Sequence, residues 1–185
     1  MDRFSAYLLV RRHLKRPASR NQALAVEAIM EELAGHLKRV VEQSHRAPSA
    51  PLPSGAPPLP AQWGVLGLLS QLDLEYAEQN ARMRGKAARQ QAELEGLPAE
   101  EAVHLERWCG SEPLDRVELA LALATILAEL ATEAAPSAHD LGLMRERGDE
   151  RGQRLDQALE QLGLEARQAA EMATTALHRI AQDLR

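Results

Sequence analysis

Hydrophobic residues recur at helical spacing in several separate segments of this chain. Residues 20–43 show the pattern most clearly, because large aliphatic side chains return there every three to five positions, with charged residues between them (Leu24, Ile29, Leu33, Leu37 and Val40). Such spacing places apolar side chains on one face of an α-helix, and Ser19 stands where a helix N-cap is favoured. A shorter helix is expected over residues 4–16, with Phe4, Leu8 and Leu14 on its apolar stripe and Pro17 at its end.

Similar patterns predict helices along the rest of the chain. Gly64 and Gly67 lie three residues apart in one of them, a spacing that lets a neighbouring helix approach closely. Residues 136–153 carry three glycines among many charges and are expected to form a loop or a frayed helix. One helix is predicted to start near Gln62, and others are predicted at residues 81–95 and 99–108. A buried helix is expected at 114–133, and the last helix at about 165–184, after a turn at Gly163.

Composition agrees with an all-α class. Hydrophobic residues make up 45% of the chain but aromatic residues only 3%, so the core must be aliphatic. The abundant Ala, Leu, Glu, Gln and Arg favour helices, and runs of β-branched residues long enough for a strand are absent. A length of 185 residues suits a single domain. We therefore expect one helical bundle of about six or seven helices over residues 1–185.

A proline-rich segment interrupts this pattern at about residues 47–61, which hold six of the ten prolines. Proline removes a backbone donor and breaks helices, so the segment is predicted to be a surface-loop insertion. It contains PxxP spacing but no flanking basic anchor. A spacer is therefore favoured over a recognition motif.

Charge and cysteine content limit the kinds of partner and metal site that can be expected for this chain. The net charge of −5 and a pI near 5.7 argue against a sequence-independent grip on nucleic acid, which needs a basic surface. The basic run at residues 11–16 is interpreted as a solvated helix face. The lone Cys109 excludes an internal disulfide and a cysteine-based zinc site. Neither a leader nor a membrane span is evident, so a cytoplasmic protein without a membrane partner is expected.

Four stretches of the chain, in order, resemble the HD-domain superfamily, in particular its small bacterial metal-dependent phosphohydrolases. In that family a His, an adjacent His–Asp pair and a later Asp bind one or two divalent metals. The metal lowers the pKa of a bound water and orients that water toward a phosphate ester. The stretches are NQALAVEAIMEELAGHL (21–37), WGVLGLLSQLDLEY (63–76), LEGLPAEEAVHLERWCG (94–110) and PLDRVELALALATILAEL (113–130), and residues 162–184 fit the closing helices.

The resemblance places the family's ligand positions on residues that cannot replace them. The first His falls at Gln22, the His–Asp pair at Ser70 and Gln71, and the later Asp at Ala122. A further family His falls at Arg84. An amide carbonyl or a hydroxyl is a poor ligand for a transition metal without charged neighbours, and alanine offers none. The resemblance therefore implies a degenerate member without the catalytic metal ligands.

Other polar residues near these positions form a possible pocket, namely Asp73, Arg84, His104 and Glu118. A rebuilt carboxylate–histidine metal centre is conceivable among them, but none is at a recognised metal-ligand spacing. We expect Asp73 to be a turn residue at a helix C-terminus, and His104 to be a satisfied, partly buried histidine.

Two functions remain open from the sequence. The favoured one is a non-catalytic HD-like protein that acts as an interaction or small-anion-binding module, without a cofactor. Its partner would be another protein or a phosphate-bearing small molecule, and a homodimer stays possible. The alternative is a metal-dependent phosphohydrolase with an atypical centre that binds a divalent metal.

A weaker alternative is an all-α nucleotide pyrophosphohydrolase of the MazG type, which uses paired carboxylates. Glu75 and Glu78, and Glu112 and Asp115, have the spacing of such pairs. However, Pro113 breaks the helix on which the second pair would have to lie.

We predict that the protein, purified without an affinity tag, carries no stoichiometric transition metal, because Gln22, Ser70, Gln71 and Ala122 are all neutral. Elemental analysis after dialysis measures this directly. Retention of stoichiometric Mn, Fe, Ni or Zn would contradict the prediction.

Overall fold

The computed structural model describes residues 1–46, 59–110, 114–131 and 135–183. These residues contain helices and no strand, which confirms the all-α class. The predicted count of six or seven helices was too low, because the described residues form ten α-helices and one short 3-10 helix. They are α1 (Arg3–His13), α2 (Pro17–Arg46), α3 (Pro60–Leu69), α4 (Leu74–Ala77), η1 (Ala81–Met83), α5 (Lys86–Leu94), α6 (Ala99–Arg107), α7 (Arg116–Leu130), α8 (Ala138–Glu146), α9 (Glu150–Leu162) and α10 (Ala166–Asp183).

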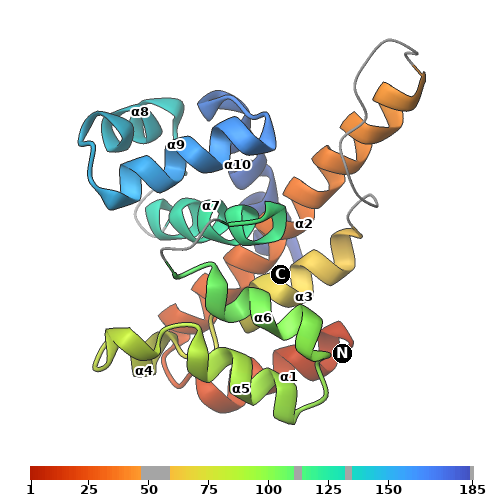
Figure 1. The fold of residues 1–185 in the computed structure, drawn as a ribbon, viewed down its shortest axis with the longest axis vertical. Helices are drawn as coiled ribbons and strands as arrows, with labels where there is room; N and C mark the ends of the chain where they lie inside the picture. The colour runs from red at the N-terminus through yellow and green to blue at the C-terminus, as the bar shows by residue number, and fades with distance from the viewer. Residues whose placement is uncertain (47–58, 111–113, 132–134, 184–185) are drawn as a thin grey trace.

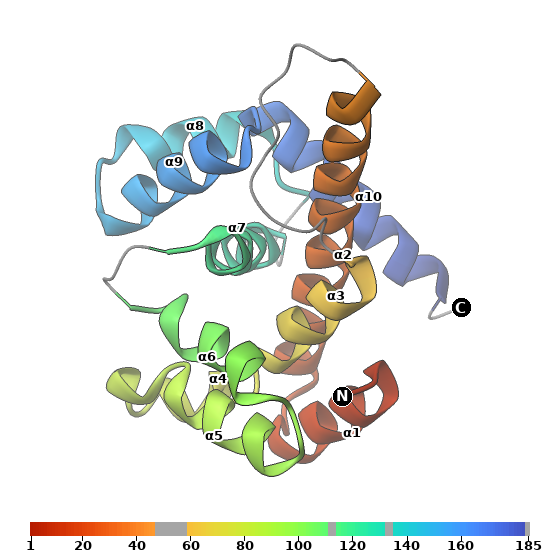
Figure 2. The same cartoon turned by 45° about the vertical axis from the view of Figure 1, so that its right-hand side comes forward.

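Helix α7 lies at the centre of the arrangement. Figures 1 and 2 show α8 and α9 above it and α5 and α6 below it, while the long α2 passes alongside. All residues from Glu118 to Ala128 of α7 are buried, so this helix is enclosed around its whole circumference, as expected of a central element. Its start is fixed by a capping box in which Asp115 accepts from the Glu118 N–H and Glu118 accepts from the Asp115 N–H.

Two apolar clusters hold the helices together. One is built around α2, α7, α8, α9 and α10, and the other joins α1, α3, α5 and α6. Both are almost entirely aliphatic, as the composition predicted. Helix α2, with 30 residues, contributes to both clusters and so connects the two parts of the molecule.

Helices α2 and α3 pack closely because of two glycines. A Cβ atom at Gly64 would lie 2.7 Å from Cγ of Glu31, and one at Gly67 would lie 3.0 Å from the backbone oxygen of Val26 and 2.9 Å from Cγ of Met30. These contacts confirm the predicted close approach. Gly67 faces Val26, whereas Gly64, which comes earlier in α3, faces Glu31, which comes later in α2. The two helices therefore run antiparallel.

The N-terminal part differs from the prediction in two ways. Pro17 begins α2 instead of merely ending α1, since proline suits the first turn of a helix, where its missing N–H is not needed. Ser19 therefore lies inside α2, buried, and is not its N-cap. Phe4 and Leu8 were placed on an apolar stripe, but their exposed fractions are 68% and 45%.

One residue of the predicted α2 stripe also lies outside the core. Val40 is 40% exposed, whereas its neighbour Val41 is buried. The helical period therefore turns Val41 inward near the end of this helix.

Residues 136–153 are also more ordered than expected, since they form α8 and the start of α9. The prediction gave too much weight to glycine. A capping box of Ser137 and Asp140 starts α8, and Asp149 caps α9. Gly152 lets the two helices touch, because a Cβ there would lie 2.5 Å from the Met144 carbonyl oxygen.

The basic run at residues 11–16 is engaged with acidic partners. Arg12 pairs with Glu95 at 2.8 Å, and Arg16 pairs with Glu75 and Glu78. Two of its cations, Arg12 and Arg16, are thus compensated by carboxylates, while Lys15 Nζ donates to the Arg12 carbonyl oxygen at 2.6 Å.

Two predictions concern segments that are only partly described. Of the proline-rich insertion, residues 47–58 lie outside the described residues, while Pro60 and Ala61 belong to α3. Among the helices that the structure describes, none combines the length and apolarity that a bilayer crossing requires.

We predict that Gly67→Ala lowers the free energy of unfolding by about 1–3 kcal/mol, because the added methyl group meets backbone of α2 that cannot move aside locally. The matched control is Gly35→Ala within α2, where a Cβ has no neighbour within 4 Å. That variant should gain up to about 1 kcal/mol from helix propensity. Chemical denaturation measures both, and an equal effect of the two substitutions would contradict the packing argument.

Candidate functional site

A cluster of buried polar side chains follows the C-terminus of α3. Ser70 and Gln71 have no exposed surface, and Asp73 is 3% exposed. Polar groups so deep in an aliphatic core are stable only with hydrogen-bonding partners. Their partners come from α5, α7 and the segment before α5, so this cluster joins elements distant in sequence.

The first part of the cluster is a directed chain of hydrogen bonds. Arg84 Nη2 donates to Gln71 Oε1 at 2.8 Å. The amide nitrogen of Gln71 must therefore be the donor on its other side, where it contacts Ser70 Oγ at 2.9 Å and Thr125 Oγ1 at 3.3 Å. Ser70 Oγ in turn donates to the Gly67 carbonyl oxygen at 2.7 Å.

The second part is the carboxylate of Asp73, which holds the start of α5. Its Oδ2 accepts from the backbone N–H of Gly85 at 2.7 Å and of Ala88 at 3.2 Å, and its Oδ1 contacts Arg84 Nη1 at 3.1 Å. Burial raises the pKa of Asp73, while Arg84 and the two amides oppose that rise. Asp73 is thus a turn residue after α3, as predicted, and also caps a second helix.

Gly85 is required at this junction for two reasons. Its φ of +81° lies in the left-handed region that favours glycine. In addition, a Cβ at this position would lie 2.5 Å from the carbonyl oxygen of Leu105 and 2.9 Å from Cα of Glu106. The backbone of Gly85 is therefore pressed against α6, which positions Arg84 immediately before it.

The guanidinium of Arg84 is enclosed by the residues after α6. Its central carbon lies 5.4 Å from the ring centroid of Trp108, within the range of a cation–π contact. Burial raises the pKa of the neighbouring Cys109 thiol to about 12, although Arg84 opposes the shift. Cys109 is therefore a neutral thiol at physiological pH.

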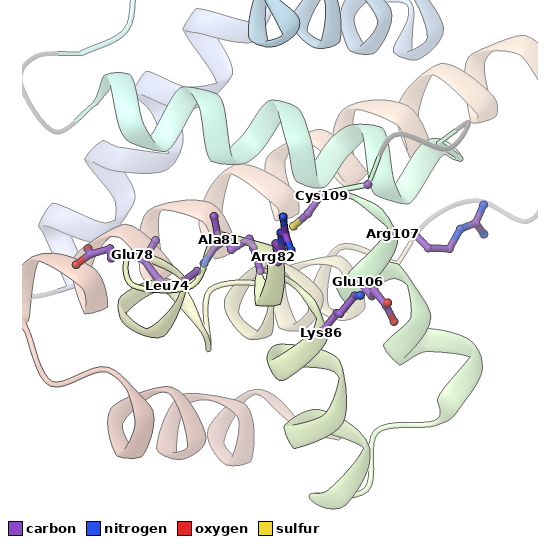
Figure 3. Close-up of a pocket in the computed structure, with 11 residues that line it drawn as sticks. Leu74, Glu78, Ala81, Arg82, Lys86, Glu106, Arg107 and Cys109 are labelled. Atoms are coloured by element: carbon purple, nitrogen blue, oxygen red, sulfur yellow. The ribbon is translucent and has the colours of Figure 1, made fainter.

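A cavity of about 750 Å³ opens beside Arg84, and we call it the basic cavity. Figure 3 shows Arg82 and Cys109 near its middle, Leu74 and Glu78 at one end, and Lys86 beside Glu106. Four cationic and two acidic residues line it, although Arg107 points away from the others in this view. The cationic residues are Arg82, Arg84, Lys86 and Arg107, and the acidic ones are Glu78 and Glu106.

Arg82 and Lys86 form no ion pair within the described residues. By contrast, Glu78 pairs with Arg16, and Glu106 pairs with Arg89 at 3.0 Å. Both acidic residues of the wall are thus compensated by cations outside it. The cavity presents uncompensated positive charge in a chain whose net charge is −5.

A second, smaller cavity of about 320 Å³ is also lined by Arg84, and we call it the indole cavity. Arg84 and Leu74 line both cavities. Ala122, Thr125 and Trp108 belong to the wall of the indole cavity.

His104 and Glu118 form a separate cluster between α6 and α7. His104 Nδ1 lies 3.0 Å from Glu118 Oε1 and 3.3 Å from Asp115 Oδ2, and Arg107 Nη1 lies 3.4 Å from Glu118 Oε1. His104 is thus partly buried and satisfied, as expected. In the part of the chain that the structure describes, no hydrogen bond or ion pair links His104 or Glu118 to Asp73 or Arg84.

The sequence-predicted positions therefore fall into groups. Ser70, Gln71, Asp73 and Arg84 are joined directly, and Ala122 lines the cavity next to them. Gln22 is a half-buried residue of α2, and the antiparallel packing of α2 on α3 brings its turn toward residues 70–71. The possible pocket of Asp73, Arg84, His104 and Glu118 is divided between two clusters.

Sequence reasoning missed Thr125 and Trp108. The signal for Thr125 was present, since it is the one polar residue inside the apolar run LALALATILA. Trp108 gave no such signal, because its position beside Arg84 arises only from the packing of α6.

The carboxylates of the MazG alternative are used elsewhere. Glu75 accepts from the backbone N–H groups of Lys15 and Arg16 at 3.1 and 2.7 Å, and Asp115 caps α7. Glu112 lies outside the described residues.

The donor set of the hydrogen-bonded cluster does not suit a divalent cation. Asp73 supplies the only carboxylate in the hydrogen-bonded cluster, and both of its oxygens are engaged. The guanidinium of Arg84, 3.1 Å away, would repel a metal ion there. His104, Asp115 and Glu118 have ligand atoms within 4.8 Å of one another, but both Glu118 oxygens already bond His104, Arg107 or the Asp115 N–H.

Comparisons with known proteins identify no relative: no family model matches the chain, and no curated protein or solved structure matches it significantly.

We predict that Asp73→Asn lowers the free energy of unfolding by about 3 kcal/mol, since it leaves the half-buried Arg84 without its counter-charge. The control is Glu171→Gln, which removes the exposed partner of Arg167 and should cause no measurable change. Thermal and denaturant unfolding compare the two. Similar stabilities of both variants would contradict a structural role for the buried pair.

Proposed function

We propose that this chain is a degenerate, non-catalytic HD-like domain that binds a small phosphate-bearing anion in the basic cavity. The observation that carries the proposal is the pair Arg82 and Lys86, which point uncompensated charge at a cavity large enough for a small molecule. Cavities that bind small ligands usually measure about 300–1,000 Å³.

Phosphate is the class of anion that this wall suits best. Guanidinium groups bind phosphate oxygens through paired N–H donors, and an ammonium group adds a mobile point charge. Arg84 adds a third cation whose position is fixed by Gln71 and Asp73. Such a wall supplies three cations to a multiply charged group.

Binding without turnover is proposed because the wall lacks a group suited to activate water. Glu78 and Glu106 are paired with arginines, and Cys109 has a pKa of about 12. Cations alone stabilise charge on a phosphate but do not take a proton from a nucleophile. The HD-like ancestry remains a proposal that rests on the resemblance.

The alternative function, a metal-dependent phosphohydrolase with an atypical centre, has one observation in its favour. His104, Asp115 and Glu118 bring three possible ligand atoms together, and Arg107 of the same cluster also lines the basic cavity. Such an enzyme would have to displace Arg107 from Glu118 to bind its metal.

Thermal melting with a panel of phosphate esters and pyrophosphate, with and without Mn²⁺, tests the proposal. We expect pyrophosphate to raise the melting temperature of the native chain without being hydrolysed. The double variant Arg82→Glu, Lys86→Glu should lose this rise. Its control, Lys38→Glu with Arg39→Glu on α2, makes the same change of net charge away from the cavity and should keep it.

Each other outcome has a definite meaning. Metal-dependent release of phosphate would establish the enzyme instead of the binding module. An equal loss of response in both double variants would show only a general charge effect and would contradict the assigned cavity. No response to any anion would leave a protein-interaction module as the function.

A further inference from the structure

The wall of the basic cavity has a charged part and an apolar part. Arg82 and Lys86 supply cations that form no ion pair within the described residues, whereas Leu74, Ala77 and Ala81 supply only hydrocarbon. Figure 3 shows Leu74 and Ala81 on one side of Arg82 and Lys86 on the other. A ligand that reaches along this cavity therefore meets positive charge at one place and an aliphatic surface at another.

The apolar part is built by α4, by the first residue of η1 and by a thiol. Leu74 and Ala77 lie three residues apart in α4, on the same side of that helix. Leu74 also packs against one of the core clusters, which holds its side chain in place. Ala81 begins η1 and is exposed. Cys109, whose pKa burial raises to about 12, stays a neutral thiol and adds a further weakly polar contact.

The same wall offers little to a nucleobase or a sugar. Among the described residues that line it, none is aromatic, and each side chain that carries nitrogen or oxygen is charged. Bases are commonly held by stacking on aromatic side chains and by hydrogen bonds to their edges. Sugar hydroxyls need acceptors, but the carboxylates of Glu78 and Glu106 already pair with arginines outside the wall. Hydrocarbon is therefore the best match for the part of a ligand that follows the phosphate.

We propose that the ligand of the basic cavity is a phosphate monoester with a short aliphatic chain. This inference rests on the proposed function, because the phosphate group has to lie at Arg82 and Lys86. The chain then lies along Leu74, Ala77 and Ala81, where each methylene group removed from water adds to the affinity. A volume of about 750 Å³ is within the range of cavities that hold such a molecule.

Calorimetry with methyl, butyl and hexyl phosphate at constant ionic strength tests the effect of the chain. We expect hexyl phosphate to bind at least about tenfold more tightly than methyl phosphate, since partial burial of five methylene groups is enough for that factor. 1-Hexanol, which has the chain without the charge, should show no measurable binding. Adenosine monophosphate should bind no more tightly than methyl phosphate.

Variants of the apolar part separate the chain from the phosphate group. Ala81→Gln places a polar side chain over this surface and should lower the affinity for hexyl phosphate to that for methyl phosphate. Its affinities for methyl phosphate and pyrophosphate should stay as in the native chain. The matched control is Ala99→Gln, at an exposed alanine that begins α6 and does not line the cavity. Ala77→Gln is a second variant of the same surface and takes the place of Ala81→Gln if that chain does not fold.

A free ester and a lipid head group share the same phosphate chemistry, and sedimentation with vesicles distinguishes them. The vesicles contain phosphatidylcholine with or without phosphatidic acid. We expect no cosedimentation, because the chains of a lipid stay in the bilayer and do not reach the aliphatic wall. Cosedimentation that depends on phosphatidic acid and is lost in Arg82→Glu, Lys86→Glu would assign the cavity to a lipid head group and overturn the proposal.

The calorimetric outcomes distinguish failure of this inference from failure of the proposed function. Binding of pyrophosphate and methyl phosphate, with hexyl phosphate no tighter, would leave the phosphate site intact and overturn the aliphatic chain. No binding of any phosphate would overturn both. An unchanged preference for hexyl phosphate in both Ala81→Gln and Ala77→Gln would place the chain elsewhere. Adenosine monophosphate that binds more tightly than hexyl phosphate would show that the cavity selects a nucleoside instead.

Discussion

The buried ion pair between Asp73 and Arg84 is the contact on which this part of the fold depends. A carboxylate that is 3% exposed is stable only when its charge is matched and its lone pairs are occupied. Asp73 meets both conditions with Arg84 and the N–H groups of Gly85 and Ala88. As a result the turn after α3, the start of α5 and the packing of Gly85 on α6 are fixed together. Loss of the pair would therefore remove a contact shared by the turn after α3, the start of α5 and the junction with α6.

The same pair determines what chemistry the centre of the molecule supports. Arg84 carries a permanent positive charge in the wall of both cavities. A guanidinium can neutralise an anion and orient it, but it cannot lower the pKa of a bound water as a metal ion does. This contrast supports a binding function for the basic cavity and gives no support to hydrolysis there.

Arg84 also lines two cavities with different surroundings. In the basic cavity, Arg82 and Lys86 are exposed cations that form no ion pair within the described residues. The smaller indole cavity is lined by Trp108 and Thr125 together with arginines that pair with carboxylates, such as Arg154 with Glu150 at 3.1 Å. A highly charged group suits the first environment, because its remaining charge stays hydrated.

The sequence alone determined the helical class, the aliphatic core, the close approach at Gly64 and Gly67, and the helix ends at Trp108 and Gly163. These features follow from local periodicity, propensity and backbone geometry, which are properties of neighbouring residues. It did not determine that Pro17 starts a helix or that residues 138–146 form one. At these places helix caps and tertiary packing prevailed over the helix-breaking tendency of proline and glycine. Only the tertiary structure decided that Arg84, Gln71 and Thr125 form one directed chain and that His104 stands apart from it. Those relations depend on which helices pack together, and no spacing along the chain encodes the direction of a hydrogen bond between them.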